Sequence, residues 1–166
     1  MIKSIVKSAL ERPSLFIALI AAILLAVVYG FEYNGYTPCD LCWYQRYPYM
    51  AIVSLMMVAY ALKEQNSWLL LLLIVLLTFV DAGIAGFHAG VEYKWWDGPS
   101  TCGGAFDFSN SELTLDNLYE SAQKVVRCDE AAWTLGGISL AGYNMLIALG
   151  LGFFGIYAFS SGKAKK

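Results

Sequence analysis

The sequence has few charged residues for its length. Of its 166 residues only 14% are Asp, Glu, Lys or Arg, whereas 58% are hydrophobic. A soluble domain of this size must cover a polar surface, so the composition argues against a soluble protein and is typical of a membrane protein. The formal net charge of -2 provides no basic field, and a nucleic-acid partner is therefore not expected.

Histidine and cysteine are also scarce. The chain has one histidine, His88, and four cysteines, which are few for a disulfide scaffold but enough for redox chemistry or one metal site. Cys39 and Cys42 form a Cys-x-x-Cys motif inside "YTPCDLCWYQRYPYM", residues 36–50. Haem attachment at this motif is excluded, because Trp43 and not a histidine follows Cys42.

Long apolar segments are what the sequence has in abundance. A helix needs about 20 mostly apolar residues to cross the hydrocarbon layer. The sequence has four apolar segments. The second, at about residues 47–62, is short and needs the aromatic residues from Trp43 onward to reach the interface. The first is longer than the apolar part of a secretory signal and is interpreted as an uncleaved anchor. The sequence therefore predicts an all-α membrane protein of one domain (1–166), a four-helix transmembrane bundle with spans at about residues 15–31, 45–62, 68–87 and 135–159.

Lysine and arginine are distributed unevenly between the two sides of such a bundle. Seven lie at the termini and in the connection 63–67, against four on the other side, which are Arg46 near the first outward loop and three in the second. By the positive-inside rule both termini are cytoplasmic, and the loops at about 32–44 and 88–134 face outward. The second loop carries "SELTLDNLYESAQKVVR" (111–127), whose apolar residues recur at helical spacing. We expect a short amphipathic helix there, lying on the membrane surface or packed on top of the bundle.

All four cysteines fall in the outward loops. Cys39 and Cys42 lie in the first loop, Cys102 and Cys128 in the second. In a bacterial cell this side is the oxidising periplasm, so two pairs suggest thiol–disulfide chemistry. A zinc site and purely structural bridges stay open as alternatives, although a separation of 26 residues in the second pair does not fit a zinc ribbon.

The two pairs differ in the loops they would close. A Cys39–Cys42 bridge closes a very small loop, gains little loop-closure entropy and is expected to be the labile, oxidising one. Cys102 lies in "GPSTCGG", which predicts a flexible, exposed setting that an incoming thiolate can reach.

Two longer stretches, "PCDLCWYQR" and "FHAGVEYKWWDGPSTC", resemble the DsbB family. The resemblance covers essentially the whole chain and includes the four spans, the topology and all four cysteines. The resemblance implies a bacterial inner-membrane enzyme that passes electrons from a periplasmic dithiol oxidase to a quinone, ubiquinone or menaquinone. It implies that Cys39–Cys42 hands electrons to the quinone. Cys102–Cys128 would oxidise a thioredoxin-fold partner similar to DsbA, with Cys102 forming the mixed disulfide.

The same resemblance assigns residues to the quinone. Arg46 matches the arginine beside it, and His88 matches a quinone-side histidine more loosely. No metal ion is expected. For Arg46 the alternative is interfacial anchoring, and for His88 a hydrogen bond at a helix end. Asp81, an acid inside the third segment, either serves quinone or proton chemistry or hydrogen-bonds a neighbouring helix.

Three rival functions remain at this stage. The first is an interaction or assembly protein whose disulfides are only structural, and the second is a transporter or channel. Four spans with a single intramembrane acid make transport the weaker of these. The third is a quinone oxidoreductase similar to the vitamin K epoxide reductase family, which places its Cys-x-x-Cys late in the chain, unlike Cys39.

Overall fold

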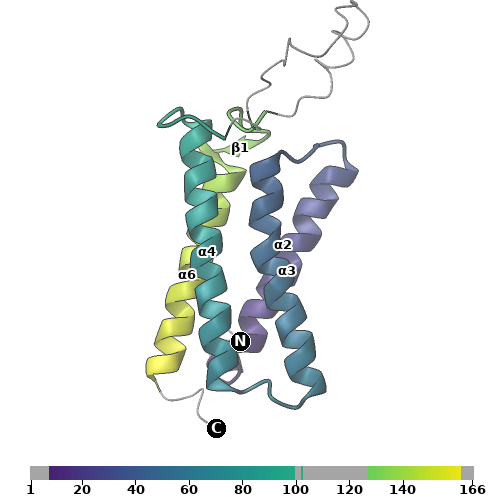
Figure 1. Ribbon diagram of the computed structural model, residues 1–166, viewed down its shortest axis with the longest axis vertical. Helices are drawn as coiled ribbons and strands as arrows, with labels where there is room; N and C mark the ends of the chain where they lie inside the picture. Colours follow the sequence, from purple (N-terminus) through teal and green to yellow (C-terminus); the bar gives the residue numbers. More distant parts are fainter. Residues whose placement is uncertain (1–7, 100–101, 103–126, 162–166) are drawn as a thin grey trace, which may run out of the picture.

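Four long helices lie side by side in the computed structural model, which describes residues 8–99, 102 and 127–161 (Figure 1). They are α2 (Pro13–Tyr33), α3 (Asp40–Ala61), α4 (Trp68–Glu92) and α6 (Leu140–Ser160). A short hairpin of β1 (Thr134–Leu135) and β2 (Ile138–Ser139) precedes α6. The described chain is thus mostly helical, as predicted. The surface helix expected over 111–127 falls almost entirely outside the described residues.

Within the described part of the chain, three helices are long and apolar enough to cross a membrane: α2, α4 and α6. These helices fit a multi-pass membrane protein. The helix α3 is also long, with 22 residues, but its first turns carry Asp40, Gln45 and Arg46. It does not belong to the three by composition, so a fourth span remains a prediction.

The helix ends differ from the expected segment ends for local reasons. The helix α3 begins at Asp40 because the Cys39 side chain caps it, with Sγ accepting a hydrogen bond from the Cys42 backbone N–H at 3.3 Å. Cys42 therefore lies in the first helical turn rather than in a loop. The last helix begins at Leu140, not near residue 135. Gly136 and Gly137, at φ 57° and 81°, form the tight turn of the hairpin instead.

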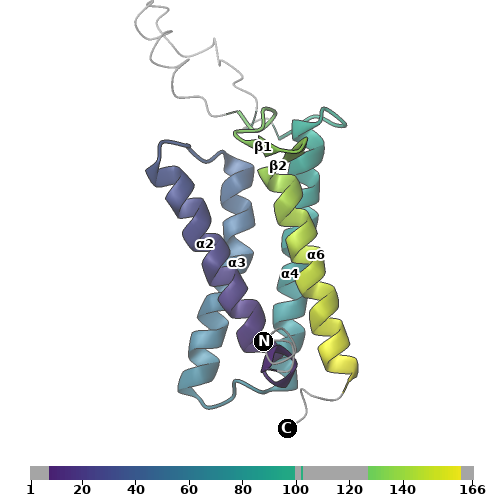
Figure 2. The ribbon, with the colours of Figure 1, turned by 180° about the vertical axis from the view of Figure 1, so that it is seen from behind.

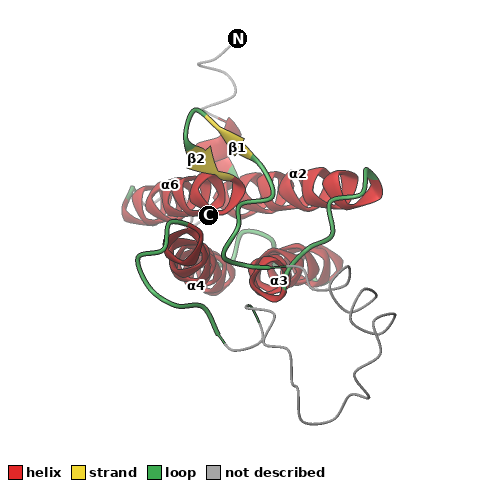
Figure 3. Cartoon of the chain, turned by 90° about the horizontal axis from the view of Figure 1, so that it is seen from above, coloured by secondary structure: helices red, strands yellow, loops and turns green. Residues whose placement is uncertain are grey.

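The helices pack around a common core at closely fitting positions. Buried Ile17, Ile52 and Ile74 come from α2, α3 and α4. The contact of α4 with α6 is the most extensive, and Gly155 allows it, because a Cβ there would come within 2.3 Å of Val75 Cγ2. Viewed along the bundle, α6 and α2 form one row and α4 and α3 the other (Figure 3).

The chain direction places the candidate site residues at one end of the bundle. The start of α2, the α3–α4 connection and the end of α6 lie at one end (Figure 2). The start of α3, the end of α4 and the hairpin lie at the other. The cysteines of both expected loops therefore come to the same end.

Candidate active site

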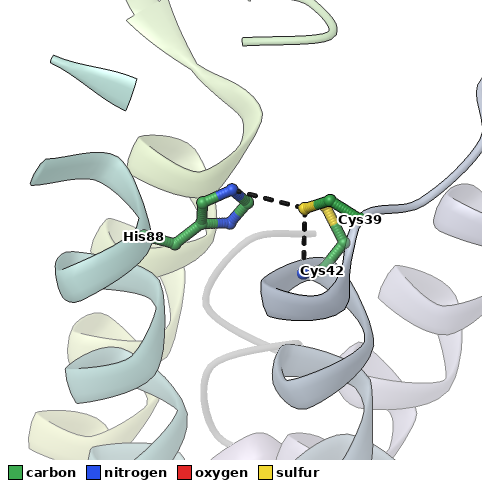
Figure 4. Close-up of side chains that lie close together, drawn as sticks. All are labelled: Cys39, Cys42 and His88. Carbon is green, nitrogen blue, oxygen red and sulfur yellow. Dashed lines mark hydrogen bonds between the residues drawn. The ribbon is translucent and has the colours of Figure 1, made fainter. Parts of the chain in front are cut away.

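Cys39 and Cys42 lie on one face at the start of α3 (Figure 4). Both are free thiols, and their sulfur atoms are 2.9 Å apart. The Cys39 thiol donates a hydrogen bond to Cys42 Sγ, and this bond, together with burial, raises the pKa of Cys39. Cys39 thus keeps its proton while the Cys42 sulfur accepts, and the helix N-terminus favours negative charge there.

The second pair is joined by a disulfide and lies in the same buried cluster as Cys39. A disulfide links Cys102 and Cys128, the two cysteines that the resemblance pairs. Both pack with Cys39, Leu41 and Val91 in one buried group, here called the cysteine cluster. The structure therefore brings the two pairs together although they come from different loops.

The expected exposure of Cys102 is wrong. Only 2% of this residue is accessible, because its disulfide to Cys128 draws it into the cysteine cluster beside Val91. The flanking sequence "GPSTCGG" indicated backbone flexibility but not the packing of the sulfur. A thiolate from outside must open this cluster to reach Cys102.

Ion pairs hold the segment that contains Cys128. Asp129 accepts hydrogen bonds from Lys94, just after α4, and from Arg127. These bonds hold the pKa of the Asp129 carboxyl well below its usual range. They fix the chain next to Cys128 to the end of α4.

Arg46 lies one helical turn after Cys42 and is buried, with 5% exposed. Its Nη1 donates to Glu32 Oε2 at 2.6 Å. Its guanidinium also lies over the rings of Tyr29 and Trp43, 4.7 Å and 4.5 Å from their centroids. This fixed, buried position argues against interfacial anchoring, because a snorkelling arginine extends its charge into water. Sequence reasoning missed Glu32; the signal was a lone acid at the end of the uncharged first segment.

His88 reaches across from α4 to the cysteine pair (Figure 4). Its Nε2 lies 3.6 Å from Cys39 Sγ and 3.7 Å from Oε1 of Glu92. On the other side of the ring, the Gln45 amide nitrogen is 2.6 Å from Nδ1. Because Gln45 donates to Nδ1, the neutral ring carries its proton on Nε2, directed toward Cys39.

A polar chain continues from His88 into the bundle. Gln45 Oε1 accepts from Asn144 Nδ2 at 2.8 Å, and the same nitrogen donates to Asp81 Oδ2 at 3.0 Å. Tyr49 donates its hydroxyl to Asn144 Oδ1 at 2.7 Å. Asp81 thus hydrogen-bonds a neighbouring helix, α6, one of its two expected roles, and is linked to His88 through two amides. Gln45, Tyr49 and Asn144 were missed, although an amide in an apolar segment was the available signal.

A pocket opens beside the cysteine pair and is bounded by all four helices. Cys39, Cys42, Arg46 and His88 line it together with many apolar side chains. Its cavity volume is about 160 Å³. An engineered apolar cavity of about 150 Å³ holds benzene, so the pocket has room for a six-membered ring.

Comparison with known proteins identifies the family. The family model described as disulfide bond formation protein DsbB matches residues 11–158. The chain belongs to the DsbB family. Membership supports a role in disulfide bond formation, disulfide oxidoreductase activity and a multi-pass membrane protein.

Individual relatives of this DsbB-family chain come from several bacteria. Proteins called disulfide bond formation protein B from Marinobacter nauticus and Nitrosococcus oceani are each 29% identical to it. These alignments cover 80% and 83% of this chain and 84% of each relative. An uncharacterized protein of Rickettsia prowazekii is 27% identical over 92% of this chain and 90% of its own length. No solved structure matches the chain.

Proposed function

We propose that the protein oxidises a periplasmic thioredoxin-fold dithiol oxidase, similar to DsbA, and passes the two electrons to a membrane quinone. The position of Cys39 carries this proposal. Cys39 belongs to the same buried cysteine cluster as the Cys102–Cys128 disulfide and also lines the pocket that contains Arg46. A cysteine in both places can receive electrons on one side and deliver them on the other.

The first exchange takes place at Cys102. A thiolate of the partner attacks Cys102 Sγ, the Cys102–Cys128 bond breaks, and Cys128 leaves as a thiolate. The partner's second thiol then displaces Cys102, which leaves an oxidised partner and two reduced cysteines. Because Cys102 and Cys128 are buried, docking of the partner must open the cysteine cluster.

The second exchange moves the electrons to the first pair. A thiolate of the reduced second pair attacks Cys39 in an oxidised Cys39–Cys42 pair, and Cys42 leaves as a thiolate. The start of α3 favours this charge, and Arg46 lines the pocket beside it. Displacement of Cys39 then restores the Cys102–Cys128 disulfide and leaves Cys39 and Cys42 reduced.

The pocket residues fit a quinone ring, either ubiquinone or menaquinone. A bound quinone supplies the acceptor for two electrons and two protons. Arg46 keeps its charge in apolar surroundings and stabilises negative charge on a ring oxygen. Glu32 and the rings of Tyr29 and Trp43 hold the guanidinium in place. His88 holds a proton at Nε2 for donation, and oxidation of Cys39 and Cys42 closes the cycle.

The same proposal includes a four-span arrangement in the bacterial inner membrane, with both termini cytoplasmic and the cysteines periplasmic. The 22 residues of α3 extend about 33 Å at 1.5 Å per residue, enough for a hydrocarbon layer of about 30 Å. The bundle end formed by the start of α2 and the end of α6 lies opposite the start of α3 and the end of α4 (Figure 1), and these two helix ends carry Cys39 and Val91 of the cysteine cluster. Thiol labelling of Lys63→Cys and of Tyr36→Cys in sealed vesicles tests this orientation. The cysteine at position 63 should react only with reagent on the cytoplasmic side, and the cysteine at position 36 only with reagent on the periplasmic side.

The activity test follows quinone absorbance after reduced carrier and a short-chain quinone are added to the purified protein. Wild type should reduce the quinone, whereas Cys39→Ser should not. Cys102→Ser should also fail with the carrier, yet reduce quinone when a small dithiol feeds Cys39–Cys42 directly. Failure of the wild type, or equal rates in wild type and Cys39→Ser, would contradict the proposal.

A further inference from the structure

We propose that the reduced protein binds a thiophilic divalent cation, Zn²⁺ in the first instance, at Cys39, Cys42, His88 and Glu92. Binding itself does not depend on the quinone reaction proposed above. Its consequence does: an ion held by both sulfurs keeps the pair reduced and stops turnover. This set of ligands differs from a zinc site built from all four cysteines, because Cys102 and Cys128 take no part.

The distances among the first three ligands suit a tetrahedral ion. The two sulfur atoms and the nearest His88 nitrogen all lie within 4.8 Å of one another. With Zn–S bonds of about 2.3 Å and Zn–N bonds of about 2.0 Å, a tetrahedral ion separates S from N by about 3.5 Å and S from S by about 3.8 Å. Cys39 Sγ and His88 Nε2 are 3.6 Å apart, so only the sulfur pair, at 2.9 Å, has to widen.

Glu92 is the fourth ligand that we infer, although it is outside the group of three whose ligand atoms lie within 4.8 Å of one another, so its side chain must move toward the sulfurs. It also gives an independent reason for an ion. It follows His88 by one turn of α4, and its Oε1 lies 3.7 Å from Nε2. Only 6% of its side chain is exposed, and Oε2 has no hydrogen-bond partner among the described residues. A carboxylate left in this state is costly, and a cation in the pocket that Glu92 lines would offset the cost.

Binding also changes the proton position on His88. In the structure Gln45 donates to Nδ1, and the ring proton is on Nε2. Coordination through Nε2 moves this proton to Nδ1, where zinc-bound histidines use a hydrogen-bond acceptor. The Gln45 amide must turn over to provide one, which breaks its bond to the Leu41 carbonyl and the bond that its Oε1 accepts from Asn144. A carboxylate at position 45 would accept from Nδ1–H and still accept from Asn144 Nδ2, so no amide has to turn over.

The site exists only in the reduced protein. Zn²⁺ replaces the protons of the Cys39 and Cys42 thiols, two protons are released, and no electron moves. Oxidation of the pair to a disulfide transfers two electrons out and removes two of the four ligands. The site therefore senses the redox state of the pair.

The test uses the full-length protein in detergent with Cys102→Ser and Cys128→Ser, so that only one dithiol is present. The protein is reduced, freed of metal with a chelator, loaded with Zn²⁺ and desalted, and we then expect one Zn²⁺ per chain by elemental analysis. Loading with Co²⁺ instead should give a thiolate-to-metal absorption band. The same protein oxidised by diamide should bind none, a control that needs no further substitution. His88→Ala should lose the ion, and Glu92→Gln should weaken binding at least about tenfold, whereas Gln45→Glu should tighten it about tenfold.

Glu64→Gln provides a matched control, since Glu64 is exposed at the opposite end of the bundle, and should bind as the parent does. Binding that persists after oxidation, or in Cys39→Ser, would overturn the proposal. So would binding that requires Cys102 and Cys128, which would indicate a four-cysteine site. Chelator-reversible inhibition of quinone reduction by Zn²⁺ tests the consequence. Binding without inhibition would overturn the block on turnover and leave the binding site standing.

Discussion

Replacing Arg46 by alanine should slow quinone reduction by about 10²- to 10³-fold in kcat, equal to about 3–4 kcal/mol, which is the usual cost of removing one oriented group that stabilises developing charge. The estimate applies because the guanidinium is already fixed. Glu32 and the rings of Tyr29 and Trp43 hold it, so no ordering cost reduces its contribution. The thiol exchange between Cys102 and the carrier should change little, because Arg46 is not part of the cysteine cluster.

Two assays separate these steps. Steady-state quinone absorbance reports the whole reaction, and rapid acid quenching followed by thiol alkylation reports carrier oxidation in a single turnover without quinone. Arg46→Lys should recover only part of the rate, since an ammonium group cannot reproduce the planar stacking on Trp43. Arg12→Ala, an exposed arginine at the start of α2, is the control and should match wild type.

Glu32→Gln is the matching variant of the residue that forms the ion pair with Arg46. It keeps the charge of Arg46 but removes the ion pair, so its loss of rate should lie between those of wild type and Arg46→Ala. A quinone rate within about twofold of wild type in Arg46→Ala would refute a catalytic guanidinium, given the loss of at least 10² that such groups cause. An equal loss in carrier oxidation would refute its assignment to the quinone step.

Three further outcomes follow from the contacts of the bundle. Asp81→Asn should keep quinone reduction within about tenfold of wild type, since a hydrogen bond contributes about 1 kcal/mol net and an amide oxygen can still accept from Asn144; complete loss would instead indicate proton transfer by Asp81. Gly155→Ala should lower stability by about 1–3 kcal/mol in detergent thermal unfolding, because its Cβ meets Val75, whereas Gly150→Ala meets nothing within 4 Å and should not. Lys94→Ala should speed reduction of Cys102–Cys128 by a small dithiol, because it loosens Asp129 beside Cys128. The lowered pKa of Asp129 means that its ion pairs are present above the ordinary value of about 3.9 and are lost only as the pH falls through the lower folded value, so the variant's effect should be equal at pH 5 and pH 7. An effect confined to pH 7 would contradict this.

Much of the helical architecture was predictable because it depends on local composition. Long apolar segments predicted four helices in the right order. Their ends differ from the prediction at the start of α3, at the start of α6 and at the end of α4, which continues to Glu92 although the sequence predicted a loop from residue 88. The Cys39 cap advances α3, and Gly136 and Gly137 delay the last helix. The Gly-Gly pair indicated a turn in the sequence, but the predicted span 135–159 included both glycines because the residues around them are apolar. Whether α3 spans the membrane remains a prediction, because its polar first turns are compatible with either outcome.

The sequence by itself determined the chemistry available at the site: two cysteine pairs, one arginine one turn from Cys42, and one histidine. Only the tertiary structure decided which groups meet. Glu32 pairs with Arg46 across two helices, and Asn144 joins Gln45 to Asp81 from positions far apart in the chain. Such pairings depend on how each helix is rotated about its axis and how far it is shifted along its neighbour. Those two quantities are set by side-chain packing over the whole bundle, as where Gly155 meets Val75, and hydrophobic periodicity does not encode them.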